Sequence, residues 1–254
     1  MARILNEKEI QQLGIVKELL KDFSATQVFE IFLGVESGVD VSIYANTDYD
    51  KEQMQEIRNG LESGVNASLY ADPKYSSDQM SVIREGLETG VDVSIYADPR
   101  FGEMEMRIIL KGLEDGVDVS AYADTKFDSY QMNEIRIGLM RGLDTTVYAY
   151  RKFDYNQMRE IRIGLKNGVD VSLYAHPKFS DWQMQIIRTG LEEALDVSVY
   201  ANGGFSAEQM IQVYLGLAHG VDVSVYANPK KDPEQMEIIR RRLEADAKRN
   251  SGKK

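Results

Sequence analysis

The chain has 254 residues, no cysteine, a net charge of −11 and a hydrophobic share of 43%. That hydrophobic share is enough for a packed core and excludes a disordered chain. The absence of cysteine excludes disulfides and thiolate metal sites, and it is compatible with a reducing compartment. The acidic balance argues against a protein that coats DNA or RNA, which needs a basic surface, and it favours partners with basic surfaces.

A repeat of 26 residues organises nearly the whole chain. The dipeptide Gln-Met, or Gln-Val or Glu-Met in its place, returns without insertion at positions 27, 53, 79, 105, 131, 157, 183, 209 and 235. A fixed period between about 20 and 50 residues is typical of repeat arrays. We therefore expect one continuous domain at 23–240 in which each repeat packs on its neighbours, acting as a monomer.

Residues 1–22 precede the repeat register. Asn6 is a candidate N-cap for a helix that reaches about Lys21, and its apolar residues recur at helical spacing: Ile10, Leu13, Val16, Leu19 and Leu20. We expect an N-terminal helical cap that covers the apolar side of the first repeat. No signal-peptide core and no apolar run of about 18 residues is present, so we expect a cytoplasmic protein that does not enter a membrane.

The repeat at 75–100 shows the plan of the long helix. Ser76, Ser77 and Asp78 offer N-cap oxygens, and the pattern predicts a helix over Ser77–Thr89. Gly90 supplies the left-handed residue that ends it. The stripe of apolar residues that should face the core consists of Met80, Ile83 and Leu87.

A second, much shorter element follows in each repeat. Asp92 is a candidate N-cap for a one- to two-turn α- or 3-10 helix over Val93–Ala97, and Asp98-Pro99 stops it. The alternative is a β-strand, because the residues alternate and are β-branched, and it would give a leucine-rich-repeat-like horseshoe. Helix is favoured because aspartate and serine suit a cap better than a strand interior.

The pattern predicts an all-α, right-handed solenoid of nine long and eight short helices, with residues 241–254 as a C-terminal cap and basic tail. Tandem helical units of this kind resemble the α-solenoids, the class that holds HEAT, armadillo and TPR arrays. The unit length resembles variant leucine-rich repeats, and the consensus is similar to repeats in uncharacterised proteins of Gram-positive bacteria and their mobile elements. The resemblance implies an architecture, and α-solenoids as a class are mostly protein-binding scaffolds.

Glycine recurs inside every long helix except the last, although it costs about 1 kcal/mol there. The positions are 34, 60, 86, 112, 138, 164, 190 and 216. We expect close approach of the neighbouring repeat to require it, since Arg242 takes the slot where no further repeat follows.

Tyrosine, aspartate and arginine also recur at fixed positions of the repeat, and each series has a structural and a functional interpretation. Tyrosine at 44, 70, 96, 122, 148, 174, 200 and 226 is either core packing with the hydroxyl at the rim or a stacking platform for bases. Aspartate at 40, 92, 118, 144, 170, 196 and 222, with Asn66 in register, is either helix capping or a calcium ladder. In both cases the structural interpretation is favoured.

Arginine recurs at 58, 84, 136, 162, 188 and 240, and four of these have glutamate four residues later. We expect intrahelical ion pairs, with a basic stripe for an anionic ligand as the alternative. His176 and His219 occupy non-equivalent positions, and no nucleophile elbow, HExxH, P-loop or dinucleotide motif occurs. We expect no catalytic residue, no cofactor and no metal site.

The positions that depart from the consensus gather at 140–182. This window holds seven basic and five acidic residues, a charge of +2, so the rest of the chain carries −13. Exposed tryptophan, tyrosine and arginine are typical of binding hot spots. The candidate partner-binding residues are Tyr130, Ile137, Arg141, Tyr150, Arg151, Lys152, Tyr155, Arg159, Ile163 and Trp182.

Our hypothesis is a non-catalytic scaffold that binds a protein partner through residues 130–188. The alternative is an acidic decoy from a phage or mobile element that blocks a nucleic-acid-binding host protein. Binding by a decoy should weaken steeply with salt, whereas hot-spot binding should not. Direct reading of nucleic acid, one base per repeat, is disfavoured by the net charge.

Overall fold

The computed structural model describes residues 21–251. Within that range it contains nine α-helices, eight 3-10 helices and no strand. The predicted all-α solenoid is therefore confirmed, and the strand alternative is wrong. The predicted N-terminal cap at 1–22 lies almost entirely outside the described residues. The chain divides into two compact units, Met1–Gly116 and Val117–Lys254.

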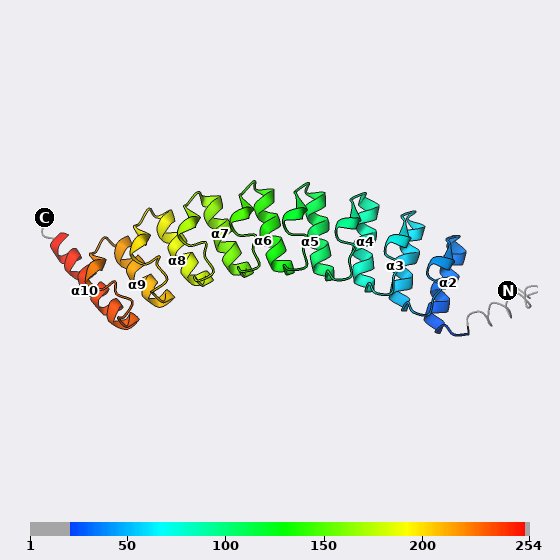
Figure 1. The fold of residues 1–254 in the computed structure, drawn as a ribbon. Helices are drawn as coiled ribbons and strands as arrows, with labels where there is room; N and C mark the ends of the chain where they lie inside the picture. Colours follow the sequence, from blue (N-terminus) through cyan, green and yellow to red (C-terminus); the bar gives the residue numbers. More distant parts are fainter. Residues whose placement is uncertain (1–20, 252–254) are drawn as a thin grey trace, which may run out of the picture. The chain divides into compact units, whose positions relative to one another are not determined.

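In the first unit, four long helices follow one another and each packs on the next (Figure 1). The long helices are α2 (Ala25–Ser37), α3 (Lys51–Glu62), α4 (Ser77–Thr89) and α5 (Glu103–Glu114). The 3-10 helices between them are η1 (Val41–Ile43), η2 (Ala67–Leu69) and η3 (Val93–Ile95).

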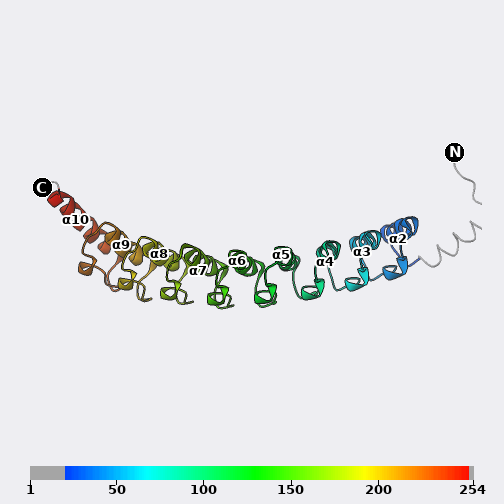
Figure 2. The same ribbon diagram turned by 90° about the horizontal axis from the view of Figure 1, so that it is seen from above.

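In the second unit the same order continues from η4 to α10. Its long helices are α6 (Ser129–Met140), α7 (Tyr155–Asn167), α8 (Asp181–Glu192), α9 (Ala207–Ala218) and α10 (Pro233–Ser251). Its 3-10 helices are η4 (Val119–Ala121), η5 (Thr145–Val147), η6 (Val171–Leu173), η7 (Val197–Val199) and η8 (Val223–Val225). Figure 2 shows that within each unit the long helices form one layer and the 3-10 turns another. The right-handed sense of the solenoid stays a prediction.

The predicted long helix over Ser77–Thr89 is confirmed. The side chain of Ser76 caps it, Gly90 follows in the left-handed conformation with φ 79°, and Met80 and Ile83 are fully buried. Leu87, predicted to face the core, is only half-buried.

The glutamine of each Gln-Met pair joins one repeat to the next. In α7, the side-chain oxygen of Gln157 accepts the N–H of Asp154, which completes a capping box. Its amide nitrogen donates to the carbonyl of Phe179 in the following loop at 2.7 Å. The same long-range bond starts from Gln27, Gln53, Gln79, Gln131, Gln183 and Gln209. One side chain therefore caps its own helix and fixes the loop of the next repeat.

The tyrosines belong to the core, as predicted, since all eight are fully buried. Their hydroxyls are not at the rim, however. Tyr148 donates to the carbonyl of Glu134 in the preceding long helix at 3.1 Å. The glycine that recurs in the long helices makes room for this hydroxyl, because a Cβ on Gly138 would overlap the Tyr148 oxygen. The predicted reason for the glycines was wrong: the close partner is the tyrosine of the same repeat, not the neighbouring repeat.

The aspartates cap the 3-10 helices, as predicted. Asp92 accepts the N–H of Ser94 at 3.1 Å and the hydroxyl of the same serine at 2.6 Å, both on Oδ1. Asn66 stands at the equivalent position but makes no side-chain cap bond. The capping interpretation therefore holds for the aspartates and is wrong for Asn66.

Arginines on the long helices join neighbouring helices as well as their own. The four predicted i, i+4 pairs are present, with distances of 2.5 to 2.8 Å. Four arginines also bind a glutamate 28 residues earlier, on the preceding long helix: Arg58 to Glu30, Arg84 to Glu56, Arg162 to Glu134, and Arg188 to Glu160. These interhelix pairs were not predicted. The paired arginines therefore connect neighbouring helices, and their glutamate partners neutralise their charge.

Candidate functional site

The candidate site lies on the second unit, and its aromatic residues stand on first turns that the repeat holds firmly. The side chains of Asp128, Asp154 and Ser180 cap α6, α7 and α8, each within a complete capping box. Because capping satisfies backbone N–H groups that a helix otherwise leaves open, these turns are well ordered. The aromatic side chains that follow are thereby presented on a fixed backbone.

Three aromatic residues project from these first turns. Tyr130 is the second residue of α6, Tyr155 the first of α7 and Trp182 the second of α8. Tyr130 is 67% exposed, Trp182 is 65% exposed and Tyr155 is 40% exposed. The rings of Tyr130 and Tyr155 lie 5.1 Å apart between centroids, so the two tyrosines form one aromatic surface across α6 and α7. Among the described residues, no ring contact joins Trp182 to this pair.

The loop before α7 carries the second group. In three earlier loops an aspartate accepts the N–H two residues later and pairs with the basic residue there: Asp72 with Lys74, Asp98 with Arg100, and Asp124 with Lys126. Tyr150 replaces that aspartate. The ammonium of Lys152 then lies 5.0 Å from the centroid of the Tyr150 ring. Tyr150, Arg151 and Lys152 are all exposed, so the loop offers an aromatic ring and two cations.

The middle of the two helices holds the remaining predicted residues. Arg159 is exposed, whereas Ile137 and Ile163 are half-buried rather than facing fully outward. Ile137 and Arg159 occupy the repeat positions of Glu85 and Arg107, which pair across α4 and α5 at 3.2 Å. The repeat register therefore makes Ile137 and Arg159 neighbours across α6 and α7.

Arg141 stands apart from the aromatic end. It is the C-cap residue of α6 and is exposed. Eleven residues separate it from Tyr130, which is about 16 Å along an α-helix. Both lie on the same helical face, since 11 residues make about three turns. We define the α6–α8 patch as the ten predicted residues together.

One exposed residue of this surface was missed. Met140, at the end of α6, is 51% exposed, and its sulfur accepts from Nη1 of Arg136 at 3.1 Å. The signal was present in the sequence, since Met140 stands where Glu62, Glu88 and Glu192 pair with their arginines. Met140 adds apolar area to the patch at its C-terminal end.

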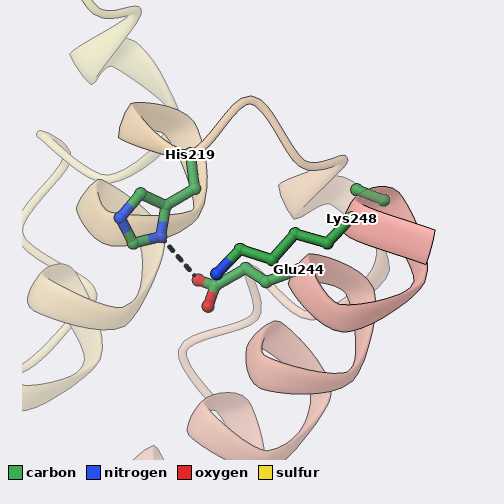
Figure 3. A pocket seen from close by; sticks show the side chains of 4 residues that line it. His219, Glu244 and Lys248 are labelled. Carbon is green, nitrogen blue, oxygen red and sulfur yellow. Dashed lines mark hydrogen bonds and ion pairs between the residues drawn. The ribbon is translucent and has the colours of Figure 1, made fainter. Parts of the chain in front are cut away.

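A small hollow lies near the C-terminal end of the second unit. His219, Glu244, Ala247 and Lys248 line it (Figure 3). Nδ1 of His219 lies 2.8 Å from Glu244, and the bonds from His219 and Arg240 lower the pKa of Glu244 although its burial alone would raise it. Asn167 and Glu192 make the equivalent bond two repeats earlier, at 2.7 Å. The histidine thus serves a tie between helices that the repeat uses elsewhere.

Across residues 21–251, no group of three or more acidic or histidine side chains is close enough to hold a metal ion. The described helices also include none with the length and apolar character that spanning a membrane requires. No protein-family model matches this chain, and comparisons with curated proteins and with solved structures give no significant match. Function is therefore inferred from the residues themselves.

Proposed function

We propose that this protein is a non-catalytic scaffold that binds another protein through the α6–α8 patch. The observation that carries the proposal is the concentration of exposed aromatic residues on consecutive repeats. Tyr130 and Trp182 occupy a position that is acidic in four other repeats, at Glu52, Asp78, Glu208 and Glu234. The same position holds Thr26, Met104 and Asn156 in the remaining repeats, so no other repeat has an aromatic residue there. A repeat array needs no aromatic ring at that position in order to fold.

The chemistry of the patch suits a protein partner. Aromatic side chains bury a large area with little loss of conformational entropy, and together with arginine they dominate interface hot spots. The rings stand on capped first turns, so little ordering is needed on binding. Arg151, Lys152 and Arg159 are exposed and, within the described residues, have no ion-pair partner. They supply charge that a partner with acidic groups complements.

An affinity capture tests the proposal and its alternative together. The full chain is used as bait in nuclease-treated lysate at low and high salt, beside the Tyr150→Ala/Trp182→Ala variant. A partner retained at high salt by the wild type and lost by the variant supports the scaffold. A basic nucleic-acid-binding protein lost at high salt and captured equally by both proteins would favour the acidic decoy.

A further inference from the structure

A second surface, formed by the 3-10 helices, carries a row of apolar side chains that the core does not use. The third residue of every 3-10 helix is aliphatic, but none is buried: Ile43, Leu69, Ile95, Ala121, Val147, Leu173, Val199 and Val225. Leu69 is 50% exposed, Leu173 44% and Val225 53%. The first residue of the same helices is buried in all described cases except Val41. Each 3-10 helix therefore anchors itself through its first residue and offers its third to solvent.

The apolar row borders a groove. In the first unit, a hollow of about 350 Å³ is lined by Leu69 of one repeat and by Leu87, Val91, Asp92 and Ser94 of the next. Its walls are aliphatic, and its one charged lining residue is a carboxylate. Leu173 and Asp196 occupy the corresponding positions in the second unit. The apolar and acidic residue types that line the hollow therefore recur in the sequence of the second unit.

The carboxylates of this border are held in one orientation. On Asp196, Oδ1 accepts both the N–H and the hydroxyl of Ser198, and Oδ2 accepts neither of these bonds. The same arrangement lowers the pKa of Asp92 and Asp222, chiefly through the serine hydroxyl. In the part of the chain that the structure describes, none of the seven capping aspartates takes part in an ion pair. Most glutamates on the described long helices, in contrast, do take part in an ion pair.

We propose that the 3-10 face of the second unit binds a basic, amphipathic helix of another protein. Its leucine-like side chains would contact Leu173, Val199 and Val225, and its lysine or arginine side chains would reach Asp170, Asp196 and Asp222. The proposal uses other residues than those of the α6–α8 patch and does not depend on that patch.

The spacing of the rungs fits a helical ligand. Packed helices lie about 8 to 10 Å apart, so the 3-10 helices of successive repeats recur at about that distance. Seven residues of an α-helix rise about 10.5 Å, so one apolar residue per heptad of the ligand helix can contact the exposed aliphatic residue of one 3-10 helix per repeat. The negative charge of this surface argues against other ligands. A row of carboxylates repels nucleic acid and anionic lipid, and a second copy of this acidic chain would also be repelled because it carries the same sign of charge.

The test uses designed probes. A fluorescent 28-residue peptide carries lysine and alanine with leucine along one helical face, and a scrambled peptide of the same composition is its control. Fluorescence anisotropy should give a dissociation constant at least tenfold lower for the amphipathic peptide. Leu173→Ser/Val225→Ser should weaken its binding at least tenfold, while Tyr130→Ala/Trp182→Ala should leave it within twofold. Asp170→Asn/Asp196→Asn should reduce the salt dependence of binding.

Three results would overturn the proposal. The scrambled peptide could bind as tightly, which would indicate charge alone. The Leu173→Ser/Val225→Ser protein, with a circular dichroism spectrum like that of the wild type, could bind unchanged. Binding could also be lost in Tyr130→Ala/Trp182→Ala instead, which would place the peptide on the α6–α8 patch and leave the scaffold proposal standing.

Discussion

The tyrosine that follows each 3-10 helix shows how two positions of the repeat depend on each other. Tyr174 fills the space that Gly164 leaves open and donates to the carbonyl of Glu160. Glycine is unfavourable in a helix, but here any side chain would displace a buried hydroxyl. The fixed spacing of ten residues between the two was visible in the sequence, as in Gly216 and Tyr226. Its cause was not, because nothing in the spacing says which repeat supplies the contact.

Replacing Gly164 by alanine tests this dependence. Alanine is the better helix former, yet its Cβ would overlap the Tyr174 hydroxyl and lie 2.9 Å from Cγ1 of Val171. We expect the free energy of unfolding to fall by about 2 kcal/mol. Tyr174→Phe should cost about 1 kcal/mol through the lost hydrogen bond. Urea denaturation of the double variant should show a loss clearly smaller than the sum; additive losses would contradict the contact.

The same tyrosines predict how stability depends on alkaline pH. Burial raises the pKa of Tyr44 and of Tyr226 to about 12, and it raises the pKa of Tyr148 and Tyr174 as well. A raised pKa in the folded state means that this stability is fully present below about pH 10, where unfolded tyrosine begins to ionise. It is lost as the pH rises from there through the folded pKa.

We therefore expect the array to unfold between about pH 10 and pH 12. Absorbance of the buried phenolates and loss of helical circular dichroism should change together. A variant in which Tyr174 and Tyr200 are phenylalanine should show a smaller alkaline loss relative to its own stability at neutral pH. Ionisation of the core tyrosines while the helical signal stays intact would refute the buried arrangement.

At the scale of elements, neighbouring long helices are joined by polar ties as well as by apolar packing. Arg162 on α7 binds Glu134 on α6 at 2.6 Å, and both side chains are about nine-tenths buried. At the last rung Arg240 makes the equivalent bond to Gln212 at 3.1 Å. The chain itself thus shows that a neutral amide can replace the carboxylate at this position.

This natural exchange supplies a matched control. Glu134→Ala removes the partner of a nearly buried guanidinium, so we expect a loss of about 2 kcal/mol in the free energy of unfolding. Glu134→Gln keeps an acceptor and should cost less than about 1 kcal/mol. Thermal and urea unfolding of the two variants would measure the difference. Equal losses would show that the hydrogen bond does not hold α6 and α7 together.

At the scale of the whole molecule, the period of 26 residues was enough to predict the number and type of the elements and the bounds of the long helix Ser77–Thr89. The short helix was predicted over Val93–Ala97 but ends at Ile95. Each signal involved was local: an N-cap, an apolar stripe, or a glycine at a helix end such as Gly90. Contacts between repeats were predicted less well. The pairing of Arg162 with Glu134 depends on how one helix is rotated against the next, and a linear period does not specify that rotation.

For the candidate site, too, local signals predicted which residues are exposed, but not their contacts with other helices. Departures from the consensus identified Tyr130, Tyr150 and Trp182, and all three side chains are exposed. Helical spacing alone could not show that the rings of Tyr130 and Tyr155 come within contact distance, because they belong to different helices. Half-burial of Ile137 was also missed, since burial at that position depends on the adjacent helix.

The most direct measurement is the affinity of the full chain for its captured partner by isothermal titration calorimetry. Tyr150→Ala/Trp182→Ala is compared with Met104→Ala/Ile211→Ala, which removes exposed apolar side chains outside the patch. We expect at least a 30-fold loss of affinity, about 2 kcal/mol, for the first variant and less than a twofold change for the second. Unchanged affinity in the first variant, or an equal loss in both, would contradict the assignment of the α6–α8 patch as the binding surface.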